Sequence, residues 1–347
     1  MHKEEANIHI THDLPTVFNT LFPKEKYSKL CVLVDENTEL YCLPKVASFL
    51  SDAHIIKIKS GEEEKTLTTC QAIWQEMTDL QLDRKALVIN LGGGVIGDMG
   101  GFCAATYKRG IDFLQMPTTL LSQVDASVGG KLGIDFNSFK NHIGVFRVPN
   151  AVLIDTNFLE TLDPRELRSG YAEVIKHALI ADKSKWKFLL TKQLIDLNWD
   201  EVVAHSVNIK AKIAEEDPTE KGLRKVLNFG HTIGHAVESF YLPQVDKKLL
   251  HGEAIAVGMI AEAYVSVKRG FISQSDADEI KQYIISIYGK VSVPVEDYKE
   301  IVPLTMQDKK NENNTVLCTL LAKVGEANFN NPISKEDIVE GLDYYNA

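Results

Sequence analysis

Residues 86–101 read ALVINLGGGVIGDMGG. The first six show little alternation of apolar and polar residues, which predicts a strand buried on both faces. Six glycines follow in the next ten residues. A loop of this kind, leading into a helix, lets backbone N–H groups approach a phosphate. Gly92, Gly94 and Gly97 match the GxGxxG pattern of dinucleotide-binding loops, although tight packing of a helix on a strand also uses glycine.

Short apolar runs recur on both sides of this segment. With a helical pattern at 66–80, they predict a parallel sheet covered by helices, and further strands are expected at 30–35, 54–58, 111–116 and 151–155. From Asp163-Pro164, a favourable helix start, to about residue 290 the patterns are long and helical. We therefore expect an α/β fold, with a Rossmann-like parallel-sheet N-terminal domain (1–162) and a mainly α-helical C-terminal domain (163–347).

The composition is that of a globular protein. Hydrophobic residues make up 44% of the 347 residues and charged residues 25%, which argues against disorder and fibrous repeats. A net charge of −10 without a basic tract argues against a nucleic-acid partner. The five cysteines show no CxxC spacing, so neither a disulfide framework nor a thiolate zinc site is expected. No signal sequence or membrane-spanning run is found, and we expect a cytoplasmic protein.

Acidic and basic residues at the ends of the early strands extend the nucleotide hypothesis. Asp35 ends the run 30–35, and an acid there can bind ribose hydroxyls, as the acid about 20 residues past the glycines does in ordinary Rossmann proteins. Glu62 and Lys65, after the run 54–58, would complete that end of the cofactor. A simple turn acid is the alternative interpretation for Asp35.

A second group of residues points to a metal. His231 and His235 stand four residues apart, which places two imidazoles on one helix face. Thr232 follows the first histidine, so the general base of a zinc peptidase is missing. Two histidines and a carboxylate with an open fourth position form a catalytic zinc set, and a structural pair of polar histidines is the alternative. Spacing leaves the ligands open among Glu173, His177, His231, His235 and His251.

Cationic side chains occur near both the glycine-rich loop and the candidate metal ligands. Glycines flank Lys131, which suggests close backbone contact, and Lys176 falls one turn after Glu173 on the same helix face. A solvated surface is the ordinary explanation for any single lysine. Together, cations beside a metal suit a substrate with phosphate and carboxylate groups, and the set predicts redox chemistry on a phosphorylated polyol. Its other members are Arg109, Lys140, Lys210, Arg224, Lys309 and Lys310.

Several long motifs resemble the 3-dehydroquinate synthase family of sugar phosphate cyclases. They are GGGVIGDMGGFCAATYKRG, MPTTLLSQVDASVGGKLGID, KNHIGVF, SGYAEVIKHAL, LNFGHTIGHA and HGEAIAVG. The resemblance implies a lyase of the shikimate pathway that uses NAD and Zn²⁺ or Co²⁺ and forms a homodimer. It would convert 3-deoxy-D-arabino-heptulosonate 7-phosphate to 3-dehydroquinate and phosphate by transient oxidation, phosphate elimination, reduction and intramolecular aldol closure.

The resemblance also implies site residues. The metal ligands would be Glu173, His231 and His251. Catalytic roles would fall to Asp125, Lys131, Asn141, Lys176 and His235, and substrate binding to Arg109, Lys210, Arg224, Asn228, Lys309 and Lys310. NAD would contact Asp35, Asn37, Glu62, Lys65, Gly93, Gly94, Val95, Ile96, Gly97, Asp98, Thr118, Thr119, Lys131, Lys140, Phe158, Leu159, Glu160 and Thr161.

Other functions remain as alternatives. Sister cyclases that make deoxy-inosose or valiolone skeletons act on substrates without a carboxylate. They need not keep all of the following residues, which this chain has: Lys140, Asn141, Lys210, Arg224 and Asn228. A metal-dependent polyol dehydrogenase would share the broad fold, but the lysine-rich set suits a neutral triol poorly. A non-catalytic NAD-binding regulator is a third class.

Overall fold

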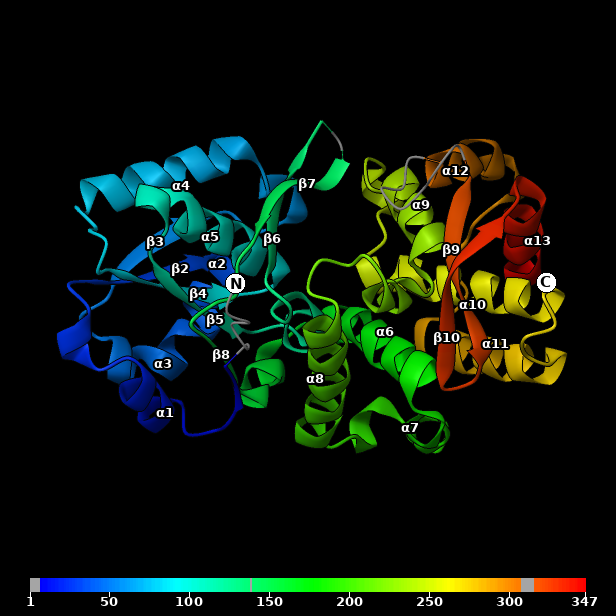
Figure 1. The fold of residues 1–347 in the computed structure, drawn as a ribbon, viewed down its shortest axis with the longest axis horizontal. Coiled ribbons are helices and arrows are strands. Elements are labelled where there is room, and N and C mark those ends of the chain that lie inside the picture. The colour runs from blue at the N-terminus through cyan, green and yellow to red at the C-terminus, as the bar shows by residue number, and fades with distance from the viewer. Residues whose placement is uncertain (1–6, 138, 307–314) are drawn as a thin grey trace. The chain divides into compact units, whose positions relative to one another are not determined.

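The computed structural model describes residues 7–137, 139–306 and 315–347. The chain forms two compact units (Figure 1). The first comprises residues 1–163 and 199–211, and the second comprises residues 164–198 and 212–347. The segment 199–211 therefore belongs to the first unit, although it follows part of the second in the sequence.

The first unit is built on a six-stranded parallel sheet, which confirms the predicted α/β class (Figure 1). The strand order is β1-β8-β5-β4-β2-β3. The strands are β1 (Ile8–Ile10), β2 (Leu30–Asp35), β3 (His54–Ile58), β4 (Leu87–Gly92), β5 (Asp112–Pro117) and β8 (Ala151–Ile154). All but β1 lie within one residue of the expected runs. β1 lies at the edge of the sheet and pairs with β8, from Ile8 opposite Val152 to Ile10 opposite Ile154, and its three residues are too few to show a pattern.

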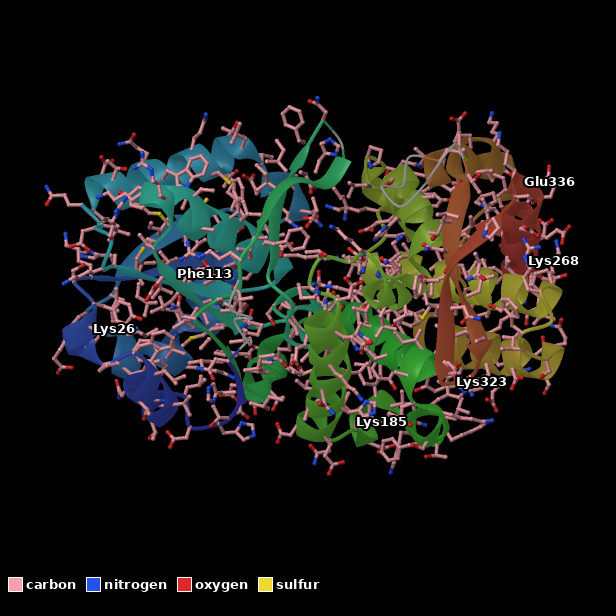
Figure 2. All side chains as sticks on the ribbon, in the orientation of Figure 1. Lys26, Phe113, Lys185, Lys268, Lys323 and Glu336 are labelled. Atoms are coloured by element: carbon pink, nitrogen blue, oxygen red, sulfur yellow. The ribbon has the colours of Figure 1, made fainter. Side chains whose placement is uncertain are left out.

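Helices bury both faces of this sheet. In β2, Cys31 and Leu33 point to a core formed with α4 and α5, whereas Val32 and Val34 point to a core formed with α1 and α3. This two-residue alternation explains why the strand is apolar throughout. Phe113 of β5 is fully buried, while Lys26 lies at the surface of the unit (Figure 2). The helices are α1 (Leu14–Leu21), α2 (Glu36–Tyr41), α3 (Leu43–Leu50), α4 (Leu67–Asp79) and α5 (Gly94–Thr106).

An antiparallel hairpin and the start of a long helix complete the first unit. The hairpin strands β6 (Lys131–Phe136) and β7 (Phe139–Phe146) were not expected from the sequence, and β6 packs against α5. Helix α8 (Trp199–Glu216) begins in the first unit and ends in the second.

The second unit surrounds helix α10 (His251–Lys268), which packs against α6, α9, α11 and α13. Helix α10 is buried around most of its circumference, in keeping with its few charged residues. The hairpin β9–β10 was not expected in this mainly helical unit. The remaining elements are α6 (Pro164–Ala181), α7 (Lys183–Leu189), α9 (His231–Tyr241), α11 (Gln274–Tyr288), α12 (Tyr298–Thr305), β9 (Val316–Lys323), β10 (Glu326–Ile333) and α13 (Lys335–Asn346).

No helix within the described ranges combines the length and the apolar character needed to cross a membrane.

Candidate active site

The predicted nucleotide-binding segments begin at the carboxyl ends of the parallel strands. The chain runs outward from β2 to β3, returns to β4 beside β2, and continues in the other direction through β5 to β8. Ligands of open parallel sheets bind outside the carboxyl ends of the strands at such a reversal. Asp35 ends β2 and Gly92 ends β4, so the acid and the glycine loop flank this point.

The glycines of the loop divide into two groups. A Cβ added at Gly100 would lie 2.2 Å from Asn90 Oδ1, so Gly100 lets α5 pack closely on β4. At Gly94 the nearest atom to an added Cβ would be Ala126 Cβ at 3.5 Å, an ordinary contact. Helix α5 begins at Gly94, and its N-cap Gly93 provides no side-chain cap. The packing interpretation therefore applies at Gly100, while phosphate binding at the uncapped helix N-terminus stays a prediction.

Asp35 has a clear local role. It is the N-cap of α2, and its Oδ1 accepts the backbone N–H of Thr38 at 2.7 Å. This capping contact gives Asp35 a structural role, and a role in ribose binding stays a prediction. Asn37 lies exposed on the same helix.

A buried ion pair lies next to the glycine loop. Lys65, only 3% exposed, donates to Asp98 Oδ2 at 2.6 Å, and Asp98 lies in the second turn of α5. Burial raises the pKa of Asp98, although the charge of Lys65 opposes this shift. For Lys65, burial lowers the pKa but the carboxylates of Asp98 and Glu62 outweigh it, so the pKa is raised. Glu62 Oε1 also lies 3.5 Å from Lys140 Nζ.

Predicted substrate residues of the first unit are held by short polar contacts. Lys210 Nζ on α8 lies 2.6 Å from both the backbone oxygen and Oδ1 of Asp125. Asp125 lies in a single π-helical turn over Ser122–Ala126, a conformation that is frequent at functional sites. The backbone N–H of Asn141, on β7, donates to Asp135 Oδ1 at 2.7 Å. Arg109 is exposed and has a left-handed backbone, with φ of 68°.

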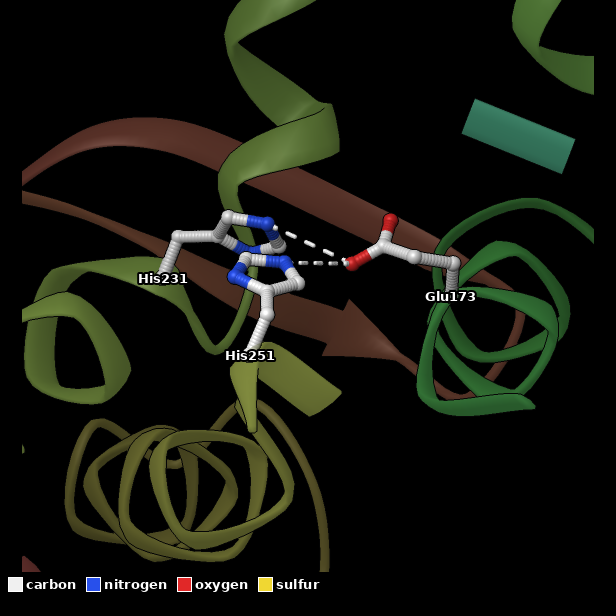
Figure 3. Close-up of side chains that lie close together, drawn as sticks. All are labelled: Glu173, His231 and His251. Carbon is white, nitrogen blue, oxygen red and sulfur yellow. Dashed lines mark ion pairs between the residues drawn. The ribbon is translucent and has the colours of Figure 1, made fainter. Parts of the chain in front are cut away.

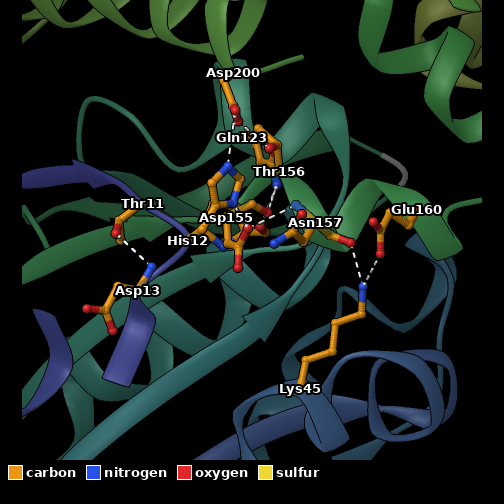
Figure 4. Close-up of polar contacts among 11 residues, drawn as sticks. Thr11, His12, Asp13, Lys45, Gln123, Asp155, Thr156, Asn157, Glu160 and Asp200 are labelled. Atoms are coloured by element: carbon orange, nitrogen blue, oxygen red, sulfur yellow. Dashed lines mark hydrogen bonds and ion pairs between the residues drawn. The ribbon is translucent and has the colours of Figure 1, made fainter. Parts of the chain in front are cut away.

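The predicted cofactor stretch Phe158–Thr161 forms most of the 3-10 helix η5 (Thr156–Thr161). The side chain of Phe158 is buried in the core beside α1 and α3. Glu160 pairs with Lys45 at 3.1 Å (Figure 4). Immediately before η5, Asp155 accepts from His12 Nδ1 at 2.8 Å, so polar contacts join this part of the chain to α3 and to the segment that follows β1.

Three of the five candidate metal ligands converge in the second unit. Glu173 Oε1 lies 3.4 Å from His231 Nε2 and 3.5 Å from His251 Nε2, so both imidazoles face one carboxylate oxygen (Figure 3). One donor atom from each of the three residues lies within 4.8 Å of the others. The ring of His235 is 5.0 Å from that of His231, centroid to centroid. This group is the set that the resemblance implies, and His235 and His251 also form a second possible group with Glu238. Metal binding itself stays a prediction.

The charges around Glu173 favour its ionised form. Glu173 is fully buried on α6, and Lys176, one turn later, donates to its Oε2. Burial alone would raise the pKa of Glu173, but Lys176 and His231 outweigh it and hold the pKa well below its usual value. Burial and the charge of Lys176 lower the pKa of His231. For His251, burial lowers the pKa, but Glu238 and Glu173 outweigh it and raise the pKa to about 9, so a metal at this imidazole would have to displace a proton. An ionised carboxylate and unprotonated imidazole nitrogens are the donors that a divalent metal requires.

Contacts from one face of α6 hold the start of α10, and with it His251, near Glu173. Arg165, Ser169 and Glu173 are spaced four residues apart and so lie on one helix face. Ser169 Oγ accepts the backbone N–H of Gly252 at 3.0 Å. Arg165 makes a bidentate contact with Glu253, with both nitrogen–oxygen distances at 2.7 Å. The N-terminus of α10, which begins with His251, is thereby anchored to the helix that bears Glu173.

A carboxylate-centred loop presents the predicted anion-binding residues of the second unit. Asp217 accepts the backbone N–H groups of Lys221, Gly222 and Arg224 at 3.0, 2.7 and 3.1 Å. Arg224 is only 2% exposed and donates to the carbonyl of Pro218 at 3.0 Å. Asn228 follows at the end of the 3-10 helix η7 (Leu223–Asn228). Lys309 and Lys310 lie outside the described residues.

Two buried carboxylates near the candidate metal ligands were not identified from the sequence. Glu238 faces His251 from α9, and Glu262 on α10 caps the N-terminus of α9. The spacing of Glu238, three residues after His235 on the same helix, could have indicated a neighbouring position. Glu262 is 32 residues from Gly230, and only the packing of the two helices brings them together.

Solved structures of the same fold first define the class. A 2-epi-5-epi-valiolone synthase from Streptomyces hygroscopicus, solved with NAD⁺ and Zn²⁺, has a TM-score of 0.89 at 25% identity, covering 100% of this chain and 98% of its own. A 2-deoxy-scyllo-inosose synthase with carbaglucose-6-phosphate, NAD⁺ and Co²⁺ has a TM-score of 0.84 at 25% identity, covering 97% and 96%. The chain thus has the sugar phosphate cyclase fold.

Sequence comparisons then give the particular family. Residues 55–169 match the family model "3-dehydroquinate synthase N-terminal", and residues 170–311 match "3-dehydroquinate synthase C-terminal". The 3-dehydroquinate synthase of Parabacteroides distasonis is 40% identical over 98% of both chains. That of Campylobacter concisus is 40% identical over 93% of this chain and 94% of its own. The chain belongs to the 3-dehydroquinate synthase family.

Proposed function

We infer that the chain is a 3-dehydroquinate synthase, a phosphate-eliminating lyase of the shikimate pathway. It converts 3-deoxy-D-arabino-heptulosonate 7-phosphate to 3-dehydroquinate and phosphate, with NAD and Zn²⁺ or Co²⁺ as cofactors. The observation that carries this proposal is the convergence of two imidazole nitrogens on one buried carboxylate oxygen, within 3.5 Å, in a chain of this family.

Both cofactors fit the residues present. For the metal, Glu173, His231 and His251 supply one oxygen and two nitrogen donors, the set of a catalytic zinc site with an open position. For NAD, the uncapped N-terminus of α5 offers backbone N–H groups to the pyrophosphate, and Asp35 lies at the carboxyl end of the neighbouring strand. When bound, NAD supplies a reversible hydride acceptor and the metal supplies a Lewis acid.

The remaining predicted residues bind and orient the substrate. Buried cations bind a phosphate or carboxylate more strongly than exposed ones, because water competes less for their charge. Lys176 is 1% exposed, Lys210 6% and Arg224 2%. We propose that these three, with Arg109, Asp125, Lys131, Asn141, Asn228 and His235, form the substrate-binding and catalytic set.

Assembly and location are also proposed. A homodimer follows from the family resemblance, and mass measurement of the purified protein by light scattering tests it. All five cysteines are free and buried, which fits a reducing compartment such as the cytoplasm.

Phosphate release tests the activity. Purified protein is given the heptulosonate phosphate and a trace of NAD, with and without a chelator. We expect stoichiometric phosphate without accumulating NADH, abolished by the chelator and by Glu173→Gln. Phosphate from glucose 6-phosphate instead would assign a sister cyclase, and NADH accumulation with glycerol would assign a polyol dehydrogenase.

A further inference from the structure

We propose that Glu238 is a positioning residue of the metal centre. Its carboxylate holds the ring of His251 so that Nε2 of that ring faces the metal. The proposal rests on the metal binding proposed above and adds a residue to that site.

The two nitrogens of His251 face two different carboxylates. Nδ1 lies 3.3 Å from Glu238 Oε2, and Nε2 lies 3.5 Å from Glu173 Oε1. A neutral imidazole carries its proton on only one nitrogen. A proton on Nδ1, donated to Glu238, leaves the lone pair on Nε2, directed toward Glu173. Glu238 is 3% exposed, so water competes little for this contact.

His231 shows the same arrangement with a different acceptor. Its Nδ1 lies 3.0 Å from the carbonyl oxygen of Phe229, and its Nε2 lies 3.4 Å from Glu173 Oε1. In both imidazoles, therefore, Nδ1 contacts a protein oxygen and Nε2 faces Glu173. A metal-binding histidine commonly donates its second N–H to a carboxylate or carbonyl, which fixes its tautomer and raises its basicity. The repeated geometry at two histidines supports this role for Glu238.

Close packing of α9 on α10 brings Glu238 within reach of His251. A Cβ added at Gly258 on α10 would lie 1.9 Å from the carbonyl oxygen of Gly230. One added at Gly234 on α9 would lie 3.0 Å from the carbonyl oxygen of Ala254. The two glycines allow backbone-to-backbone approach, so a side chain of α9 can reach the first residue of α10.

A different role for Glu238 is also chemically reasonable. One donor atom each from His235, Glu238 and His251 lies within 4.8 Å of the others, which would suit Glu238 as a direct ligand of a second ion. The two roles differ in stoichiometry: a positioning residue predicts one zinc ion per chain in the wild type, and a ligand role predicts two.

Zinc affinity separates these roles. We measure the Kd by competition with a chromophoric chelator, together with metal content, for the wild type, Glu238→Gln and Glu238→Ala. We expect one zinc per chain in the wild type. Glu238→Ala should bind zinc about 10- to 100-fold more weakly, and Glu238→Gln should lie between them because its amide oxygen still accepts a hydrogen bond. The absorption spectrum of the Co²⁺-loaded protein should change in both variants, a signature that lost stability alone does not produce.

Asp337→Asn is the matched control. Asp337 is also a buried carboxylate of the second unit, 7% exposed, but it pairs with Lys268 and Arg269. Its loss should lower stability and leave the zinc Kd unchanged. If Glu238→Ala does not fold, the zinc Kd and the cobalt spectrum of Glu238→Gln are compared with those of the wild type.

Wild-type zinc affinity and an unchanged cobalt spectrum in the Glu238 variants would overturn the role of Glu238 while leaving the proposed function intact. Two zinc ions in the wild type and one in Glu238→Gln would overturn it in favour of a direct ligand. A wild-type protein that binds no zinc and releases no phosphate would overturn the proposed function as well.

Discussion

The carboxylate of Glu262 accepts the backbone N–H of Gly230 at 2.5 Å, immediately before α9. Gly230 has a φ of 80°, and an added Cβ there would lie 3.1 Å from the backbone nitrogen of Met259. This position therefore requires glycine, which cannot cap the helix with a side chain. Glu262, from α10, replaces that cap and also accepts from Ile233 at 3.0 Å. His231, the first residue of α9, is thus held in place by the neighbouring helix.

Glu262→Gln should weaken the start of α9. Glutamine has one acceptor oxygen in place of two, and it removes a negative charge from the positive end of the helix. We expect the free energy of unfolding to fall by about 1–3 kcal/mol and zinc to bind more weakly. Urea unfolding and chelator competition measure both quantities. Glu340→Gln, which removes an exposed carboxylate from α13, serves as control, and equal values for the two variants would contradict the capping role.

Two glycine substitutions should separate packing from cofactor binding. Gly100→Ala places a methyl group 2.2 Å from Asn90 Oδ1, and overpacking of this kind costs about 1–3 kcal/mol. Gly94→Ala meets only an ordinary contact at 3.5 Å and should keep the stability. Its methyl group would nevertheless stand where the proposed dinucleotide approaches the backbone, so NAD should bind more weakly. Thermal unfolding and calorimetric titration with NAD measure the two effects, and an unchanged NAD affinity in Gly94→Ala would count against the loop as the cofactor site.

Removing one member of the Lys65–Asp98 pair should cost more than removing both. Lys65→Met leaves the carboxylate of Asp98 buried without its nearest cation, a loss expected at about 3–5 kcal/mol. In Lys65→Met/Asp98→Asn no such charge remains, so part of the stability should return. Urea unfolding of the wild type, both single variants and the double variant gives the coupling energy. Additive losses would show that the 2.6 Å contact contributes little.

Asp337→Asn should show a defined pH dependence. Burial would raise the pKa of Asp337, but hydrogen bonds from Ser334 and Lys268 and the charge of Arg269 lower it. A lowered carboxyl pKa contributes stability above the unfolded-state value of about 3.9, and this contribution is lost as the pH falls through the folded-state pKa. The variant should therefore be less stable than the wild type at pH 7 and pH 5, with a difference that shrinks below about pH 4.

Thermal unfolding at pH 7, 5 and 3.5 measures that difference. Glu340→Gln is the control, because Glu340 pairs with the same Lys268 but is 47% exposed, and exposed pairs contribute about 0–1 kcal/mol. A difference between wild type and Asp337→Asn that stays constant down to pH 3.5 would contradict the lowered pKa.

Local patterns in the sequence determined the parallel sheet and its glycine loop. The strands β2 to β5, β8 and the helix α4 were predicted to within one residue at their ends, because apolar runs and helical periodicity are properties of neighbouring residues. Glu173, His231 and His251 were among five candidate ligands for the same reason, because their residue types and helix positions are local, and the family resemblance singled out these three.

Tertiary structure alone decided which distant groups meet. The three-residue strand β1 forms only because β8 offers it an edge, and the segment 199–211 joins the first unit across 35 intervening residues of the second. Glu238 and Glu262 look like ordinary helix glutamates in the sequence, and only the glycine-mediated contact of α9 with α10 places them beside a candidate metal ligand and a helix end. Such contacts depend on packing between segments far apart in the chain, which no local pattern encodes.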